Sequence, residues 1–274
     1  MLLRLARATH PLPTLAVTAF TVALGAAAGV HPGKLAVLGA AVLVGQASIG
    51  WANDAIDADR DRLAGRLDKP IASGEISRGA VMIAAKTALT LDVPLSLAIG
   101  WRGGAAHLAA VGWAWMYDVG LKATPLSFLP YAISFGLLPM VITGALPGGP
   151  APPPLIMACG ACCGIAAHFA NTVGDAEDDR RFGILGLPQR IGEGPSVLVS
   201  ALGVAAAAGC LLGAVGADRF VLVCGVASIT LAGLTVLALR SAAGRRLAFR
   251  LVIASVAALI IGFIGSGGTA LTGR

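Results

Sequence analysis

The sequence predicts an all-α membrane protein, a bundle of nine transmembrane helices that forms a single domain over residues 1–274. Hydrophobic residues make up 57% of the chain, charged residues only 12%, and the mean hydropathy is +0.83. A soluble domain carries about 25% charged residues, so a chain of this length must use the lipid bilayer as its solvent. The apolar stretches are continuous and rich in Ala, Leu and Gly rather than alternating, which favours helices over barrel strands.

Nine stretches approach the length of about 20 residues that a helix needs to cross the hydrocarbon core. The 37 glycines suit such a bundle, because small residues let membrane helices approach closely. The stretch over residues 104–119 is the shortest. The expected spans are 13–30, 35–52, 79–99, 104–119, 125–145, 152–172, 196–216, 219–239 and 248–268.

The basic residues predict the orientation of the bundle. In this arrangement all of the 20 Lys and Arg except Lys34, Arg102, Arg219 and Arg274 fall on the side of the N-terminus. This bias predicts an integral protein of a bacterial cytoplasmic membrane, with the N-terminus and both acidic loops on the cytoplasmic side. The net charge of +6 is therefore topological. The chain has no basic run with interleaved aromatic residues, so we expect no nucleic-acid partner.

The connection over residues 51–75 is unusually acidic. Its carboxylates continue the second span with helical spacing: Asn53, Asp57 and Asp61 stand at i, i+4 and i+8, and Asp54 joins the same face. Like charges at this spacing repel each other, so the stripe costs stability unless a cation neutralises it.

A second acidic connection covers residues 171–193. Asn171, Asp175 and Asp179 repeat the spacing i, i+4 and i+8 at the end of the sixth span. Two matching stripes at helix ends predict one shared ligand site. The alternative is that each stripe belongs to a solvated loop whose acids pair with neighbouring arginines, namely Arg60, Arg62, Arg180 and Arg181.

Mg²⁺ is the cation that these stripes favour. It takes oxygen ligands and is usually shared with substrate phosphates. His and Cys are absent from both stripes, which argues against zinc.

Several cations follow the stripes and are candidates for binding a phosphate. Arg66 and Lys69 follow the first stripe, and Lys122 lies in a short connection after the fourth span. Ordinary positive-inside topology is the alternative explanation for each of them, and it is the one we expect for Arg180 and Arg181.

Taken together, these motifs resemble the signatures of the UbiA superfamily of intramembrane prenyltransferases. The matching residues are Asn53-Asp54-x-x-Asp57-x-x-x-Asp61 with Arg66 and Lys69-Pro70-Ile71, then Tyr117 with Lys122, and then Asp175-Ala176-Glu177-Asp178-Asp179 with Leu187-Pro188-Gln189-Arg190.

The resemblance implies a helical bundle with a central cavity that binds an isoprenyl diphosphate through Mg²⁺. It implies transfer of the prenyl group to an aromatic or other lipophilic acceptor in the bilayer. The residues that match metal-binding or catalytic positions are Asp54, Asp57, Asp61, Asp175, Asp179 and, for catalysis only, Lys122. The substrate-binding candidates are Asn53, Arg66, Lys69, Tyr117, Asn171 and Asp178.

The sequence departs from the family pattern at three places, and one of them is Asn171, which stands where some members carry an acid. Lys69-Pro70-Ile71-Ala72 stands where Arg-Pro-Leu-Pro is usual, and His10-Pro11 stands where many members have Arg-Pro. These departures leave the acceptor open.

Three other functions stay open from the sequence, and one of them is a variant of the same fold that transfers a phosphoribosyl group to a polyprenyl phosphate, a lipid without the diphosphate leaving group. A terpene cyclase of the same family would ionise the same diphosphate and quench the cation internally, and the motifs do not separate it from a transferase. A cation transporter would carry acids near the membrane midplane, where only Asp92 is expected, whereas the acids cluster at one face.

Four further polar residues carry separate expectations. Asp92 orients an acceptor or binds backbone amides freed by Pro94, and His168 is a general base or an interior histidine with satisfied hydrogen bonds. His10 and His107 are expected at the membrane interface.

Overall fold

The computed structural model describes residues 1–173, 176–216, 218–238, 242–266 and 269–272, and the described residues contain helices but no strand. The elements are α1 (Leu2–Arg7), α2 (Pro11–Ala27), α3 (Pro32–Leu63), α4 (Arg78–Ile99), α5 (Trp101–Val119), the 3₁₀ helix η1 (Leu121–Ala123), α6 (Leu129–Thr143), α7 (Pro154–Val173), α8 (Ala176–Arg181), α9 (Leu187–Ile191), α10 (Glu193–Val215), α11 (Arg219–Ala238), α12 (Ala242–Gly265) and the 3₁₀ helix η2 (Thr269–Leu271).

Every expected span coincides with one long helix, so the all-helical prediction is confirmed. Among the described residues, α3, α4, α7, α10 and α11 are long and apolar enough to cross a membrane. Stretches of α2, α6 and α12 form shorter apolar helices, and α5 meets neither criterion. The chain is therefore an integral membrane protein, while the count of nine crossings stays a prediction.

Helix α3 is longer than a bilayer is thick, and this places the first acidic stripe. At 1.5 Å per residue its 32 residues extend about 48 Å, against about 30 Å of hydrocarbon. The helix begins at Pro32, where a missing N–H costs nothing, and the His31 side chain accepts a hydrogen bond from the amide of Gly33. Its last turns therefore carry the acidic stripe past the apolar part of the bundle.

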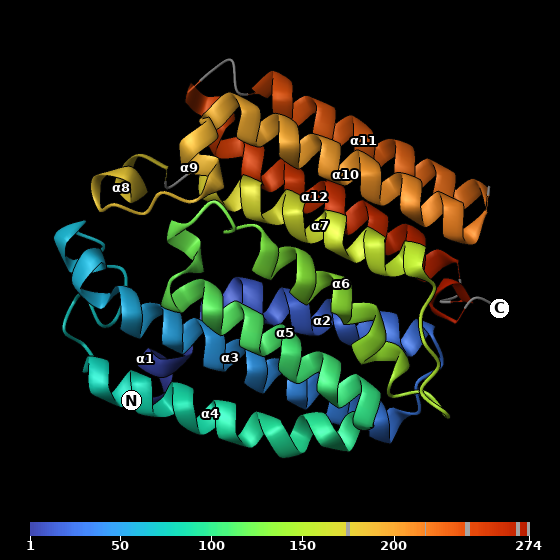
Figure 1. Ribbon diagram of the computed structural model, residues 1–274, viewed down its shortest axis with the longest axis horizontal. Helices are drawn as coiled ribbons and strands as arrows, with labels where there is room; N and C mark the ends of the chain where they lie inside the picture. Colours follow the sequence, from blue (N-terminus) through green and yellow to red (C-terminus); the bar gives the residue numbers. More distant parts are fainter. Residues whose placement is uncertain (174–175, 217, 239–241, 267–268, 273–274) are drawn as a thin grey trace.

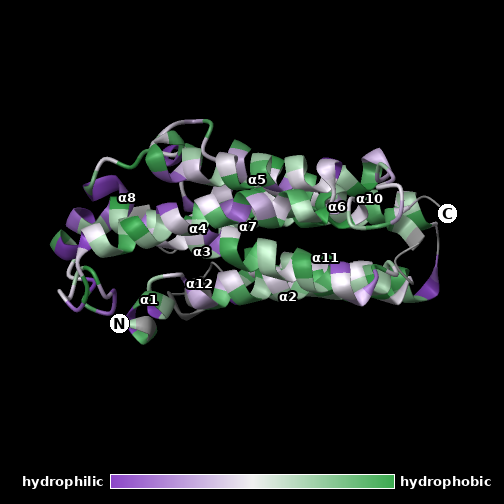
Figure 2. Cartoon of the chain, turned by 90° about the horizontal axis from the view of Figure 1, so that it is seen from below, coloured by the Kyte–Doolittle hydropathy of each residue, from purple (hydrophilic) through white to green (hydrophobic). Residues whose placement is uncertain are grey.

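The short helices gather at the end of the bundle that carries the acidic stripe. Figure 1 shows α1, α8, α9 and the last turns of α3 at this end, with the C-terminus at the other. Figure 2 shows that hydrophilic residues are concentrated at the same end, while the long helices are largely apolar. Leu198 and Leu202 on α10 and Val223 and Val226 on α11 are exposed, as lipid-facing residues are.

Glycines allow α6 and α7 to pack in backbone contact. A Cβ added at Gly160 would lie 2.3 Å from the carbonyl oxygen of Phe135, and one at Gly164 would lie 2.3 Å from that of Tyr131. Neither glycine has a positive φ, so close approach rather than backbone conformation requires them. This contact holds Tyr131 and Phe135 in place at the cavity described below.

We predict that Gly164→Ala lowers the unfolding temperature in detergent by several degrees, because an overpacked contact costs about 1–3 kcal/mol. Gly209→Ala on α10 is the matched control, since a Cβ there meets nothing within 4 Å. Ala is the better helix former, so the control should unfold at the same or a slightly higher temperature. Equal destabilisation of both variants would contradict the packing argument.

Candidate active site

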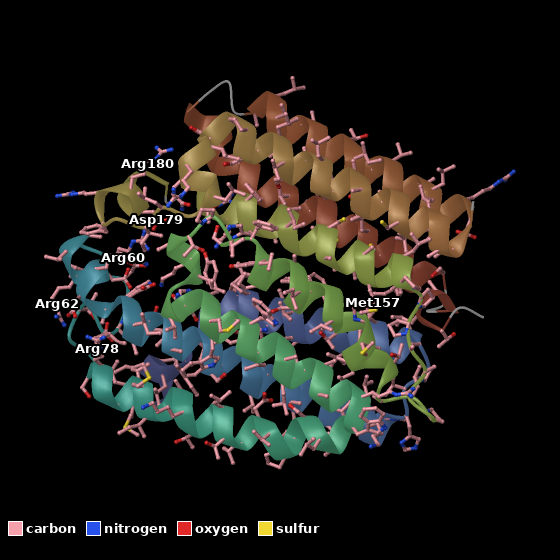
Figure 3. All side chains as sticks on the ribbon, viewed as in Figure 1. Arg60, Arg62, Arg78, Met157, Asp179 and Arg180 are labelled. Atoms are coloured by element: carbon pink, nitrogen blue, oxygen red, sulfur yellow. The ribbon has the colours of Figure 1, made fainter. Side chains whose placement is uncertain are left out.

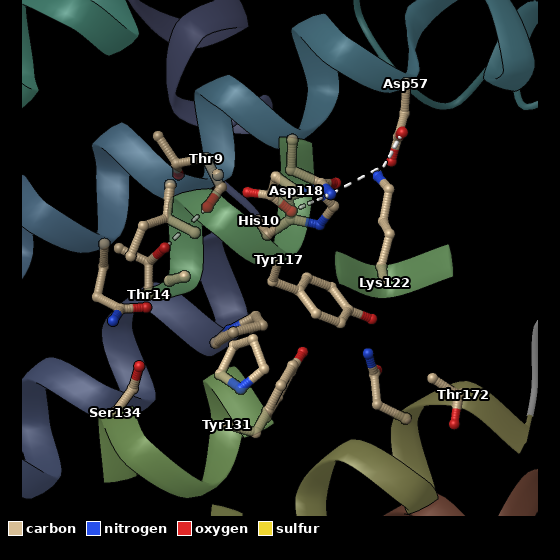
Figure 4. A pocket seen from close by; sticks show the side chains of 18 of the residues that line it. Thr9, His10, Thr14, Asp57, Tyr117, Asp118, Lys122, Tyr131, Ser134 and Thr172 are labelled. Atoms are coloured by element: carbon tan, nitrogen blue, oxygen red, sulfur yellow. Dashed lines mark hydrogen bonds and ion pairs between the residues drawn. The ribbon is translucent and has the colours of Figure 1, made fainter. Parts of the chain in front are cut away.

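A cavity of about 380 Å³ opens at the acidic end of the bundle. Its lining comes from α2, α3, α5, α6, α7, α8 and α9 and from the connections that precede α2 and follow α3, α5 and α8. Figure 4 shows Asp57, Lys122 and Asp118 on one side of this cavity and Thr14 and Ser134 on the other. The central cavity that the family resemblance implied is therefore present.

The carboxylates of the first stripe are buried. Asp54, Asp57 and Asp61 are 3%, 6% and 1% exposed. By contrast Asp59, on the other face of α3, is 70% exposed and pairs with Arg62 and Arg78. A solvated loop would not bury its acids, so the structure favours a ligand site over a merely solvated charge run.

Lys69 compensates two of these buried carboxylates. After α3 the chain reverses at Gly65, which has a φ of 69°, and returns Lys69 to the helix. Its Nζ lies 3.0 Å from Asp54 Oδ1 and 2.8 Å from Asp61 Oδ2. Burial alone would lower the pKa of Lys69, but the two carboxylates outweigh it and raise that pKa above its usual value of 10.5.

The third carboxylate, Asp57, is held by cations from two directions. Lys122 Nζ, from η1, lies 2.5 Å from Asp57 Oδ1, and Arg60 Nη2 lies 2.7 Å from Oδ2. The Asn53 amide donates to Asp57 at 3.2 Å and to Asp118 Oδ1 at 2.8 Å. Helix α5 is thereby fixed to α3 at the cavity mouth.

The second acidic segment meets the first through Arg60. Asp179 Oδ1 lies 3.9 Å from Arg60 Nη1, and Asp179 Oδ2 accepts a hydrogen bond from Gln189 Nε2 at 2.8 Å. Figure 3 shows Arg60 and Asp179 at the same end of the molecule, beside Arg180. Asp175 and the side chain of Asp178 lie outside the described residues.

The connection that carries Gln189 is docked closely against η1. Ser127 Oγ accepts a hydrogen bond from the amide of Leu187 at 3.0 Å. A Cβ added at Gly186 would lie 2.7 Å from the carbonyl oxygen of Lys122 and 2.8 Å from Gln189 Oε1. Close approach of backbone to backbone thus positions Lys122 and Gln189 together.

Most of the candidates from the sequence line this one cavity. These are Asn53, Asp57, Arg66, Lys69, Tyr117, Lys122, Asn171 and Asp179. Asp54 and Asp61 do not line the cavity themselves, but both contact Lys69, which does. Arg66, another lining residue, has its Nη1 3.6 Å from Asp61 Oδ1. The Tyr117 and Tyr131 rings meet edge to face with centroids 5.3 Å apart.

Two histidines are not where the sequence placed them. His10 was expected at the membrane interface, but it lines the cavity and its Nε2 lies 3.0 Å from Asp54 Oδ1. It precedes Pro11 and has a φ of 54°, which turns the ring toward α3. His107 is buried and its Nδ1 lies 2.8 Å from Ser96 Oγ. No spacing within the sequence indicates either contact.

Neither Asp92 nor His168 lines the cavity. Asp92 accepts a hydrogen bond from Ser96 at 3.2 Å and lies 3.5 Å from His107, so neither of the two roles expected for it is seen. His168 is 1% exposed and its Nε2 lies 3.0 Å from Ser127 Oγ. Its burial favours an interior histidine over the general base, but its hydrogen bonds are not all satisfied, because Nδ1 is buried without a hydrogen-bond partner in the described part of the chain.

The donor set of the mouth fits Mg²⁺. The oxygen ligands available are carboxylates of Asp54, Asp57, Asp61 and Asp179, and Asp61 Oδ1 is buried without a hydrogen-bond partner. Across the described ranges, three or more acidic, His or Cys side chains do not converge on one point. The carboxylates are instead each compensated by Lys, Arg or His, and a metal would have to replace those contacts.

We predict that Lys69→Met lowers the free energy of unfolding by about 1–3 kcal/mol, because it removes the cation that two buried carboxylates share and leaves Asp61 to Arg66 and Asp54 to His10. Since the raised pKa lies above 10.5, the contribution of Lys69 is fully present below that pH and is lost only as pH rises through the folded-state pKa. The loss should therefore be constant between about pH 6 and 9 and should be largely restored in Lys69→Arg. Equal stability of Lys69→Met and the parent protein would contradict the assignment.

Comparison with known proteins identifies the family of this chain and solved structures with a similar fold. Residues 13–256 match the UbiA prenyltransferase family, while no curated protein matches the sequence. The fold resembles a UbiA homologue from Archaeoglobus fulgidus solved with DMAPP and Mg²⁺, at 18% identity and a TM-score of 0.73 over 95% of this chain and 98% of that one. A UbiA homologue from Aeropyrum pernix K1 (18% identity, TM-score 0.69, 90% and 98% covered) and a digeranylgeranylglyceryl phosphate synthase (15%, 0.71, 97% and 98%) are also similar. At these identities the solved structures show a shared fold, and the sequence match shows that the chain belongs to the UbiA prenyltransferase family.

Proposed function

We propose that this protein transfers an isoprenyl group from an isoprenyl diphosphate to an aromatic or other lipophilic acceptor within the membrane, in a Mg²⁺-dependent reaction. The observation that carries the proposal is the meeting of both acidic segments at one cavity mouth, where Arg60 contacts Asp57 and Asp179. Solved UbiA homologues from Archaeoglobus fulgidus with Mg²⁺ and either GPP or DMAPP support this class of substrate.

In this proposal Lys69, Lys122 and Arg66 bind the diphosphate. In the ligand-free protein these cations contact Asp54, Asp57 and Asp61. When diphosphate oxygens replace those carboxylates as their partners, the carboxylates become available as metal ligands together with Asp179 and, on the family resemblance, Asp175. Bound Mg²⁺ would supply charge neutralisation for the departing diphosphate.

The chain must also stabilise positive charge on the prenyl group and keep water from it. Tyr117 and Tyr131 lie in the lining with their rings packed together, and Phe135 stacks on Tyr131 with centroids 6.4 Å apart. Aromatic faces attract cations, and this wall lies just inside the mouth. We therefore assign these rings to the allylic, cation-like centre, with the acceptor approaching from the membrane side. The N-terminus and both acidic segments are placed on the cytoplasmic side, as the charge bias predicts.

Purified protein supplied with radiolabelled GPP, Mg²⁺ and a membrane-lipid extract should form a labelled product. This product should be heavier than geraniol, the alcohol that hydrolysis of GPP gives. The product should need both the extract and the metal, and its mass would identify the acceptor. A labelled hydrocarbon or alcohol formed without extract would instead indicate the cyclase alternative. Absence of any reaction with GPP and longer diphosphates would contradict the proposal.

We predict that Asp57→Asn and Asp179→Asn each reduce turnover by about 100-fold or more, since the metal that neutralises the departing diphosphate loses a charged ligand. Asp59→Asn is the matched control, because Asp59 lies on the exposed face of the same helix, two residues from Asp57. It should retain the parent rate. Activity that survives in both site variants but falls in the control would reverse the assignment.

A further inference from the structure

The Gln46 amide is a polar group of the cavity that has no partner among the described residues. Gln46 lines the cavity from α3, is only partly exposed, and makes no hydrogen bond or ion pair within the described residues. Leaving a side-chain amide unpaired costs free energy once water is excluded, and polar groups at membrane depth are retained mostly for function. We therefore expect the Gln46 amide to form a hydrogen bond with a ligand bound in the cavity.

Gln46 lies on the same face of α3 as the acidic stripe but deeper in the bundle. It precedes Asn53 by seven residues, two helical turns, which is about 10 Å along the axis. That distance leaves room for one ring system between the amide and the mouth. The isoprenyl diphosphate would thus be bound at the mouth, and the acceptor would be bound deeper, next to Gln46.

Two hydroxyl groups from other helices line the same cavity. The Thr14 hydroxyl donates to the carbonyl oxygen of Thr9 at 2.8 Å, and the Ser134 hydroxyl donates to that of Ala110 at 2.9 Å. Because each hydrogen is committed, the two oxygens face the cavity as acceptors only. Figure 4 shows Thr14 and Ser134 on the side away from Asp57 and Lys122.

The cavity is therefore divided by charge. Its described cationic side chains, Arg60, Arg66, Lys69 and Lys122, all pair with carboxylates at the mouth. Around Gln46 the lining is neutral, and a second, mostly apolar pocket of about 60 Å³ shares Gln46 and Ser134 with the cavity and is also lined by Val42, Leu138 and His107. A carboxylate or phosphate held here would be desolvated with a single amide as donor, at high cost.

We infer that Gln46, Thr14 and Ser134 recognise the acceptor, and that the acceptor is an uncharged molecule bearing a hydroxyl group. Its O–H donates to one of the two hydroxyl oxygens or to the Gln46 carbonyl, and its oxygen accepts from the Gln46 amide. This inference rests on the proposed function and narrows it. It excludes acceptors whose recognised group is a carboxylate or a phosphate.

A matched pair of probes tests the charge preference: naphthalene-1,4-diol and the same diol with a 2-carboxylate. Binding of each is measured by titration calorimetry to protein saturated with Mg²⁺ and a non-hydrolysable thiolo analogue of GPP. The diol should bind at least tenfold more tightly than its carboxylate. Equal binding, tighter binding of the carboxylate, or no binding of either probe would overturn the inference.

Two variants test the residues. Gln46→Met keeps the length of the side chain and removes the amide, and it should weaken diol binding about tenfold, the effect of one lost hydrogen bond to a buried group. Thr14→Val should weaken it less. Thr21→Val is the control, because Thr21 makes the same kind of bond to a backbone carbonyl on α2 but does not line the cavity.

Affinity for the GPP analogue separates the two proposals. It should be unchanged in Gln46→Met, since the amide lies far from the mouth. A diol affinity that does not fall in Gln46→Met, or a GPP affinity that rises because the tail passes the amide, would overturn the acceptor assignment alone. Failure of the GPP analogue to bind the parent protein with Mg²⁺ would instead overturn the proposed function.

Discussion

The organisation of this protein depends on the compensation of buried negative charge at one end of a helical bundle. Asp54, Asp57 and Asp61 lie on one face of α3 and are nearly inaccessible, so each must have a positive partner. Lys69 returns from a turn to reach two of them, and Lys122 arrives from η1 to reach the third. Lys69 comes from the connection that follows α3 and Lys122 from a segment distant from α3 in sequence, so the same ion pairs that stabilise the carboxylates also assemble the mouth of the cavity. A diphosphate that binds together with a metal ion can replace both members of these pairs, since its oxygens can bind the cations and the metal can bind the carboxylates.

Features that depend on local spacing could be predicted from the sequence. The apolar stretches predict the helices, and the i, i+3 and i+7 spacing of the aspartates predicts that α3 continues beyond the membrane with the acids on one face. Features that depend on tertiary contact could not. His10 reaches Asp54 only because α2 starts with a left-handed residue, and Gln189 reaches Asp179 only because Gly186 lets its connection dock against η1. Gln46 gave no signal in sequence, since a single glutamine in an apolar span has no characteristic pattern.

The division of the cavity follows from the same physics. Among the described residues that line the cavity, charged side chains occur only at the end where α3 leaves the apolar zone, because charged groups deeper in the bundle would lose their hydration without sufficient compensation. Closer to the membrane interior the lining is aromatic around Tyr131 and then neutral and apolar toward His107. Glycine contacts between α6 and α7 fix the aromatic wall relative to the mouth. The order of environments along the cavity, from a charged mouth through an aromatic wall to a neutral interior, matches a reaction that separates charge between a diphosphate and a carbon centre.

The most direct test of the central claim is a crystal structure of the protein with the thiolo analogue of GPP and Mn²⁺ in place of Mg²⁺, with the metal located by anomalous scattering. The account predicts metal between the Asp57 and Asp179 segments, with Lys122 and Lys69 turned from carboxylates to the diphosphate. Metal bound elsewhere, or a diphosphate bound while Lys122 still contacts Asp57 and no metal lies near Asp179, would contradict it.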